Sequence, residues 1–282
     1  MAADPVFRPP TPEAKAQLGR TRKAIFSGDP GGPAQLQALF DGPEGPALAR
    51  LALQDRDPRM QIAAATAATS LAKAHPRLFA FLPGLNRSTP PRLALATLQL
   101  NFATGCDTPM LFGMDALDHP SAEVVELAIR LSVAQTQQIR SPALADRVAA
   151  WLERRSGPAR LRILAVRLLA DLGAVHLTGL MARLSKDGDP LVTGEARVGW
   201  ARLAPEDAGK QAEAWSQDRR PCSQMAALRA TAEIGAANPW PLIPAVRLAA
   251  RSPAVCADPL TGTALKVSDV AQQVLAYWDR GL

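Results

Sequence analysis

Short polar turns that contain a proline return along this chain at nearly even intervals, and this spacing restricts the fold more than any other feature. The prolines stand 30–38 residues apart, at Pro58, Pro90, Pro120, Pro158, Pro190, Pro221 and Pro253. A fixed period of this length is typical of repeat proteins, in which each repeat buries its apolar face only against its neighbours. The spacing therefore predicts an array of about seven repeats.

Each period holds two helix-forming segments, one before the proline and a second, usually longer one after it. The stretch from Pro158 to Gly173 is the clearest second helix, because a proline opens it and a glycine suited to a left-handed conformation closes it. Its leucines and alanines recur at steps of three and four and so share one face. Aromatic residues make up only 5% of the chain, and β-branched residues are too sparse for a large sheet. The sequence therefore predicts an all-α fold.

The proline turns also suggest how the chain is divided. We expect a flexible Pro-rich tail at residues 1–12, N-terminal capping helices at 13–46 and the repeat array at 47–282. In the last repeat the turn after Pro253 is about a dozen residues longer than elsewhere, which gives an enlarged loop at 253–267. Such a loop either carries binding contacts or folds over the open end of the array as a cap.

The turn and the second helix resemble the short bacterial form of the HEAT repeat, the phycobilisome-lyase-type HEAT-like repeat. That family combines an apolar helix, an Asp-Pro turn and an Ala-rich helix ending in Leu-Gly. This chain has Asp57-Pro58 and Asp189-Pro190 at the turns, with Leu172-Gly173 and Ile234-Gly235 at helix ends, and the likeness spans about residues 47–280. It implies a right-handed α-solenoid of about seven two-helix HEAT-like repeats. It implies little about activity, because such repeats serve scaffolds, lyases and hydroxylases.

Motifs for metal, phosphate or covalent chemistry are missing from the sequence. No HxxxH, HExxH or CxxC pattern occurs, and no glycine loop is followed by Lys-Ser/Thr. The His-Glu pairs of HEAT-type di-iron hydroxylases are also missing. We therefore expect no catalytic residue, no metal and no cofactor.

Two of the three cysteines are candidates for a disulfide. Cys222 and Cys256 each lie in the turn of their repeat, and these two repeats are adjacent. The turns of successive repeats line one edge of a solenoid, and the enlarged loop lets Cys256 reach toward Cys222. A disulfide, which would imply an oxidising compartment, and two free thiols are both open at this point.

A row of arginines is the candidate binding surface. When the second helices are aligned on their closing Leu-Gly or its equivalent, Arg130, Arg167, Arg197 and Arg229 fall at one position in four repeats. By analogy with HEAT solenoids this position faces the concave side, where guanidinium groups bind carboxylates or phosphates. Trp200 follows Arg197 on the same helix and is expected at the rim of this groove. The alternative is an ordinary salt-bridged face, because Arg130, Arg167 and Arg229 each have an acidic residue four positions away.

From these features we expect a non-enzymatic scaffold that binds a protein or peptide partner, acidic in character, along the concave helix layer. The alternative is nucleic-acid binding by the arginine-lined groove, as in some HEAT-type DNA glycosylases; the net charge of +6 is only mildly basic. A second alternative, a tetrapyrrole (bilin) lyase, rests on the repeat resemblance. No apolar run is long enough to span a bilayer, and the first ten residues lack the pattern of a signal peptide. We expect a cytoplasmic protein, or an exported or periplasmic one if a signal peptide has been removed.

Overall fold

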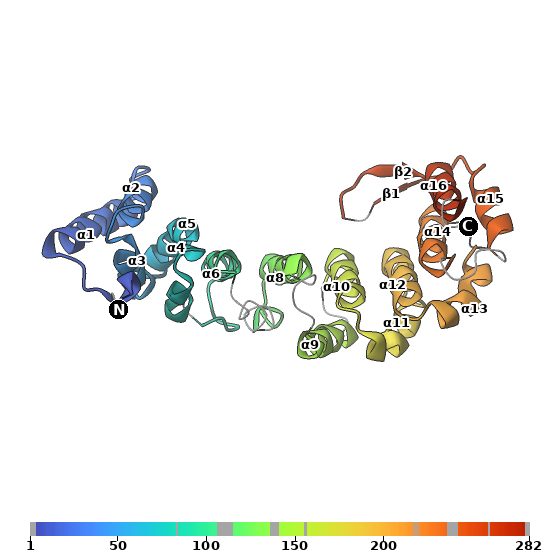
Figure 1. The fold of residues 1–282 in the computed structure, drawn as a ribbon, viewed down its shortest axis with the longest axis horizontal. Helices are drawn as coiled ribbons and strands as arrows, with labels where there is room; N and C mark the ends of the chain where they lie inside the picture. The colour runs from blue at the N-terminus through green and yellow to red at the C-terminus, as the bar shows by residue number, and fades with distance from the viewer. Residues whose placement is uncertain are drawn as a thin grey trace. The chain divides into compact units, whose positions relative to one another are not determined.

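The computed structural model describes residues 4–82, 84–105, 115–135, 141–154, 157–216, 218, 220–235, 242–258 and 260–279. The all-α expectation is confirmed: paired helices follow one another as in an α-solenoid, and one short β-hairpin interrupts them (Figure 1). The chain divides into two compact units, Met1–Ser132 and Val133–Leu282, so that the expected array crosses a boundary.

The first unit begins with a short turn, and the helices that follow bury two apolar clusters among its described residues. Its elements are η1 (Pro5–Phe7), α1 (Pro12–Ser27), α2 (Gly32–Phe40), α3 (Gly45–Leu53), α4 (Pro58–Ala67), α5 (Thr69–Ala72), η2 (Pro76–Phe81), α6 (Pro91–Ala103) and α8 (Ala122–Gln135), whose last residues belong to the second unit. Helices α1 and α2 occupy the segment expected to hold the capping helices. Leu36, Phe40, Leu48 and Leu53 are fully or almost fully buried between the first helices.

The expected flexible tail at residues 1–12 is corrected for the residues that the structure describes. Pro5–Phe7 forms a single 3₁₀ turn, capped by the Asp4 side chain, which accepts a hydrogen bond from the Val6 backbone N–H at 3.0 Å. The Val6 side chain is completely buried in the core of the first unit. Although the segment is rich in proline and polar residues, the buried Val6 side chain holds the turn against α3.

The second unit is built from two rows of helices. Its elements are α9 (Pro142–Glu153), α10 (Ala159–Asp171), η3 (Val175–Leu177), α11 (Thr178–Leu184), α12 (Pro190–Leu203), α13 (Pro205–Ser216), α14 (Pro221–Gly235), α15 (Ile243–Ala249), β1 (Val255–Ala257), β2 (Ala264–Lys266) and α16 (Val267–Asp279). The second helices α10, α12, α14 and α16 pack side by side in one row, and α9, α11, α13 and α15 each pack against the helix that follows (Figure 1). This is the repeat arrangement that the proline spacing predicts.

Local sequence signals begin and end these helices. The Asp189 side chain caps α12 by accepting hydrogen bonds from the backbone N–H groups of Leu191 and Val192, and Pro190 occupies the first turn, where no N–H partner is needed. Gly173, after the end of α10, has a φ of 67°, the left-handed conformation expected of a closing glycine. The Asp-Pro and Leu-Gly pairs thus set the two ends of the second helices.

Helices α12 and α14 approach each other closely at a glycine. A Cβ atom added to Gly194 would stand 2.8 Å from the Cβ of Ala226, closer than two such atoms approach in real structures. Nearly every residue of α12 from Val192 to Leu203 is buried or partly buried, because helices cover it on several sides. The row of second helices is therefore tightest at this point.

The enlarged loop expected at residues 253–267 is an antiparallel β-hairpin. In its register Val255 pairs with Lys266, Cys256 with Leu265, and Ala257 with Ala264. The segment that was expected to be an enlarged loop thus contains two paired strands. In the described part of the chain no helix combines the length and apolar character that a bilayer span requires.

The close contact at Gly194 gives a stability prediction. Gly194→Ala should lower the free energy of unfolding relative to Gly179→Ala by at least about 1 kcal/mol, because overpacking a tight helix contact costs about 1–3 kcal/mol. Gly179 is the matched control, since it is also helical and a Cβ there meets nothing within 4 Å. Urea unfolding of both variants measures the difference, and equal stabilities would contradict the packing described here.

Candidate functional site

A disulfide fastens the hairpin to the row of second helices. Cys222 lies in the first turn of α14 and Cys256 in β1, with their Cα atoms 5.2 Å apart, and the structure joins the two side chains in a disulfide. Of the two possibilities that the sequence left open, the structure thus contains the bonded one. The link closes a loop of 34 residues that includes the whole of α15. Cys106 lies outside the described residues.

The turn of the hairpin is organised by one acidic side chain. Asp258 Oδ1 accepts hydrogen bonds from the backbone N–H groups of Leu260 and Thr261, both at 2.9 Å, and from the Thr261 hydroxyl at 3.2 Å. Burial raises the pKa of the Asp258 carboxyl group, but these hydrogen bonds and the nearby charge of Arg167 together lower it below its ordinary value. Asp258 is therefore an ionised carboxylate at neutral pH.

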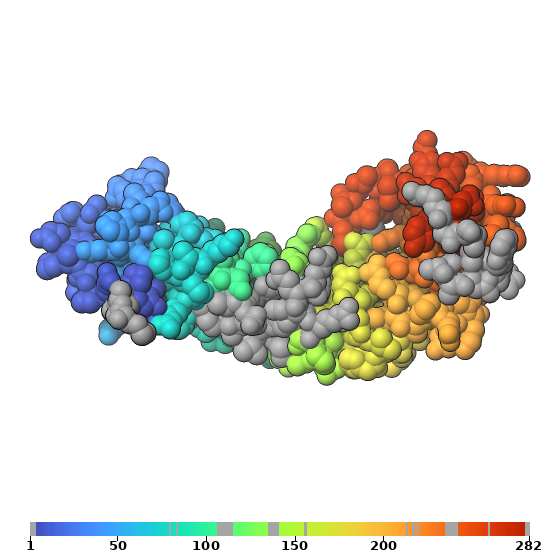
Figure 2. All heavy atoms as spheres, viewed as in Figure 1, coloured from blue at the N-terminus to red at the C-terminus, as the bar shows by residue number. Residues whose placement is uncertain are grey.

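The hairpin covers a cavity of about 340 Å³ in the second unit. Its walls come from α12, α14, the hairpin and α16, and Figure 2 shows the atoms of the hairpin standing over this row of helices. The residues around the cavity are Pro190, Leu191, Gly194, Glu195, Cys222, Met225, Ala226, Arg229, Cys256, Ala257, Asp258, Leu265, Val270 and Gln273. Most of them are apolar, and the volume lies in the range of small-molecule sites.

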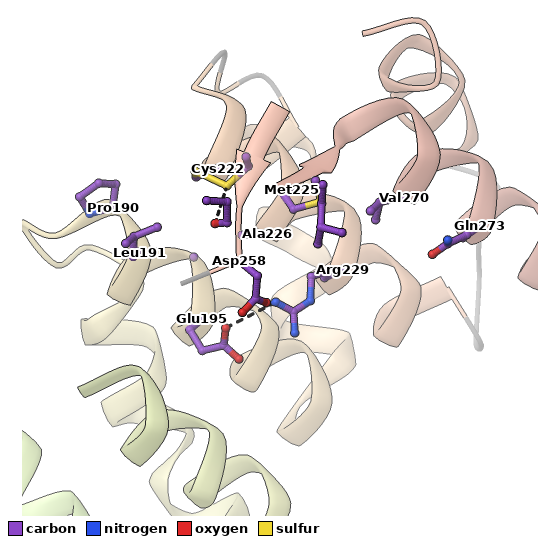
Figure 3. Close-up of a pocket in the computed structure, with 14 residues that line it drawn as sticks. Pro190, Leu191, Glu195, Cys222, Met225, Ala226, Arg229, Asp258, Val270 and Gln273 are labelled. Atoms are coloured by element: carbon purple, nitrogen blue, oxygen red, sulfur yellow. Dashed lines mark hydrogen bonds and ion pairs between the residues drawn. A yellow bond between two sulfur atoms is a disulfide. The ribbon is translucent and has the colours of Figure 1, made fainter. Parts of the chain in front are cut away.

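The charged side chains gather in one part of the cavity. Figure 3 shows Glu195, Arg229 and Asp258 close together, while the disulfide of Cys222 lies apart from them beside Met225. This separation gives the cavity a polar part and an apolar part. A ligand with the same division of polarity would match it.

Glu195 is the centre of the charged part. Its carboxylate is only 6% exposed and accepts two hydrogen bonds from Arg167, Nε to Oε1 at 2.6 Å and Nη2 to Oε2 at 3.1 Å. Arg229 Nη1 approaches Glu195 Oε2 at 3.6 Å from the other side, and Asp258 Oδ2 lies 3.9 Å from Arg167 Nη2. Two guanidinium groups and two carboxylates therefore form one network beside the apolar walls.

The structure brings together only two of the four arginines aligned from the sequence. Arg167 and Arg229 both reach Glu195. Arg130 lies in the first unit and pairs with Glu126 of its own helix at 2.8 Å, as the salt-bridged alternative expects. Arg197 lies elsewhere in the second unit, 3.8 Å from Asp218 and over the ring of Trp215.

The position of Arg197 follows from an alignment error of one residue. Arg202 bridges Asp171 and Glu233, which lie 31 residues before and 31 residues after it, so these three residues hold equivalent positions. By that register Val198, and not Arg197, is equivalent to Arg167 and Arg229. One residue corresponds to about 100° around a helix. Arg197 therefore points toward α13, away from Glu195.

Trp200 shares the direction of Arg197. Its ring packs against Trp215 of α13, with the two centroids 5.7 Å apart. The side chain is partly buried in the core of the second unit. The structure therefore places Trp200 between the two helix layers, whereas the sequence places it on the rim of a groove.

Glu195 was missed by the sequence reasoning. It stands in an otherwise apolar or small stretch of α12, between Gly194 and Ala196, and has no basic residue at a spacing of three or four. A single acidic residue inside such a stretch is the one signal available, because a buried carboxylate requires a partner from another element. Its partners come from the preceding and following repeats.

Groups that hold a metal ion are not found among the described residues. The buried His119 is occupied structurally: its Nε2 lies 2.8 Å from the Thr89 carbonyl oxygen, and its Nδ1 accepts a hydrogen bond from the Ser121 backbone N–H. His176 pairs with the exposed Asp146. Neither histidine lines the cavity, whose polar side chains are the carboxylates of Glu195 and Asp258, the guanidinium group of Arg229 and the carboxamide of Gln273.

Comparisons with known proteins give similarity to solved structures and nothing at the level of sequence families. No family model matches the chain, and no curated protein matches it. Among solved structures, the chain is similar to a chain in the complex of CpcE and CpcF of phycocyanin lyase from Nostoc sp. PCC7120, with 15% identity and a TM-score of 0.43. The match covers 83% of this chain and 94% of the other.

This match corrects the functional expectation from the sequence. The similar chain belongs to a phycocyanin lyase complex, and the match does not support the expectation of a non-enzymatic scaffold or of a protein without enzymatic activity. Of the functions expected from the sequence, the tetrapyrrole lyase is the one in the same class as the similar protein. At this identity the similarity concerns the helical fold and names no substrate for this chain.

The disulfide gives a prediction about the stability of the second unit. Replacing both cysteines, Cys222→Ser with Cys256→Ser, should lower the free energy of unfolding by about 3–4 kcal/mol, the chain-entropy value for a closed loop of 34 residues. Urea unfolding with and without a reductant measures it. The reductant should lower the free energy of unfolding of the wild type to that of the double variant, and it should not change the free energy of unfolding of the double variant. A wild type whose stability does not respond to the reductant would contradict a stabilising role of the disulfide.

Proposed function

We propose that the cavity of the second unit binds a small, largely apolar molecule on which the protein acts. The observation that carries this proposal is the cavity of about 340 Å³, walled mainly by apolar side chains and covered by a disulfide-anchored hairpin. Repeat helices alone would need no such cover. The hairpin is the one departure from the repeat pattern in the second unit's described residues, and it lines the cavity.

The ligand that fits this proposal best is an open-chain tetrapyrrole, and the reaction is that of a bilin lyase. The Asp-Pro turns and Leu-Gly helix ends support membership in the phycobilisome-lyase-type HEAT-like repeats. A bilin is a long, conjugated and mostly apolar molecule, so the apolar walls at Leu191, Met225 and Val270 suit one part of it. Because a lyase of this kind transfers its bilin to a protein, the proposal includes an acceptor protein as partner.

Nucleic-acid binding is less well supported. A phosphate backbone is bound by cations that are available to replace its counterions. Each of the four aligned arginines has a carboxylate within 4 Å: Glu126 for Arg130, Asp218 for Arg197, and Glu195 for Arg167 and Arg229. The carboxylates of Glu126, Asp218 and Glu195 therefore offset most of the positive charge of the row that was expected to form a basic groove.

The disulfide between Cys222 and Cys256 is an indication of the cellular compartment. Disulfides persist in oxidising compartments and are reduced in most cytoplasms. Of the two locations expected from the sequence, we therefore propose the exported one.

Titration with biliverdin tests the proposed function. The oxidised protein should bind it saturably, with a change in the visible absorption of the bilin. Val270→Trp should weaken binding at least about tenfold, because the indole fills part of a cavity that buries most of its ligand. Leu248→Trp is the matched control, since Leu248 is 74% exposed and does not line the cavity. Absence of saturable binding, or equal loss in both variants, would refute the cavity as the binding site.

A transfer assay distinguishes a bilin lyase, which attaches the bilin to an acceptor protein, from a protein that only carries the bilin. Incubation with a bilin and an apo-phycobiliprotein should give a covalent bilin adduct that survives denaturing electrophoresis. The adduct should form faster with the wild type than with Val270→Trp and at the wild-type rate with Leu248→Trp. Binding without transfer would leave a bilin carrier in place of a lyase.

A further inference from the structure

Arg229 is the one cation that lines the cavity among the described residues, and it is poorly satisfied by its surroundings. Its side chain is 38% exposed, and its ion pair with Glu195 spans 3.6 Å between Nη1 and Oε2. Within the described part of the chain no hydrogen bond to this guanidinium group is found. A guanidinium group has five N–H donors, so most of the donor capacity of Arg229 faces the cavity and solvent.

The carboxylates near Arg229 are engaged elsewhere. Both carboxylate oxygens of Glu195 accept hydrogen bonds from Arg167 in a bidentate pair, which is stronger than a single contact between a carboxylate and a guanidinium group. Asp258 Oδ1 is used by the hairpin turn, and Oδ2 lies nearest to Arg167. Arg229 therefore contributes a second guanidinium group to a network in which the first already holds the buried acceptor.

From this geometry we propose that Arg229 recognises a carboxylate of the ligand, so that the cavity selects molecules with an apolar body and a carboxylate group. The inference rests on the proposed function, because it concerns the same cavity. When the ligand binds, its carboxylate takes the free donors of Arg229, while Glu195 keeps its two hydrogen bonds to Arg167. The apolar body then lies against Leu191, Met225 and Val270.

The charge of the network favours a carboxylate over a phosphate. Arg167 and Arg229 balance Glu195 and Asp258, so the network is neutral before a ligand arrives. A singly charged carboxylate adds one negative charge beside Arg229. A phosphate monoester adds nearly two and places them near the carboxylates of Glu195 and Asp258, which repel it.

The test compares an acid with its ester in four proteins. Biliverdin and biliverdin dimethyl ester share the conjugated body, and only the first carries carboxylates. The wild type should bind the acid roughly 10- to 100-fold more tightly than the ester, as expected for a hydrogen bond to a charged group. In Arg229→Leu this preference should be lost, so that the acid binds no more tightly than the ester.

Two further variants complete the test. Arg183→Leu makes the same change at an exposed arginine of α11 that pairs with Glu153 outside the cavity, and it should preserve the preference for the acid. Glu195→Gln removes the negative charge beside Arg229 and should increase the affinity for the acid relative to that for the ester. Palmitate and methyl palmitate, used as competitors of biliverdin, show whether a fatty acid shares the site. If palmitate competes better than its methyl ester and Arg229→Leu removes this difference, Arg229 recognises the carboxylate of both kinds of ligand.

The outcomes distinguish the inference from the proposed function. If acid and ester bind equally to the wild type, or if Arg229→Leu keeps the preference for the acid, Arg229 is not the recognition residue, although the cavity still binds the tetrapyrrole body. If neither biliverdin nor its ester binds, the proposed function fails for tetrapyrroles. A preference of palmitate over its methyl ester that Arg229→Leu removes would then still support carboxylate recognition.

Discussion

The apolar stripe of each second helix is the constraint on which the rest of this structure depends. A helix such as α10 cannot leave its leucines in water, so it requires a neighbouring helix of the same design. In the second unit this requirement is met by the row of α10, α12, α14 and α16, drawn tight where Gly194 faces Ala226. The same row holds polar residues of successive repeats at fixed distances. Glu195 on α12 thereby lies between Arg167 on α10 and Arg229 on α14.

The hairpin turns this regular surface into a site. A row of helices presents a shallow face, and a ligand bound there would remain largely in water. The disulfide from Cys222 to Cys256 and the turn organised by Asp258 hold two short strands over the row, so that apolar side chains surround the space between them. Part of the network that orders the helices also forms the polar part of the cavity. Stability of the repeat packing and the chemistry of the site therefore depend on overlapping residues.

Sequence periodicity predicted the helices and their order, because these depend on local signals such as Asp189-Pro190 and Gly173. The site was predicted less well, since it depends on register between repeats. A shift of one residue in α12 assigned Arg197 to the row in place of Val198, and it moved Trp200 to a surface that it does not occupy. Glu195 escaped notice because its partners lie 28 and 34 residues away. The hairpin could not be derived from a composition that is poor in strand-forming residues, although the cysteine positions indicated which elements it joins.

The central claim is that the hairpin and the second helices enclose a ligand site. Hydrogen–deuterium exchange of the oxidised protein, measured with and without biliverdin, tests this claim most directly. The account predicts slower exchange on ligand addition in the peptides that cover residues 190–198, 222–230 and 254–266, with no change in those that cover residues 12–53 of the first unit. Protection confined to the first unit, or unchanged exchange in the hairpin at a saturating concentration of bilin, would contradict it.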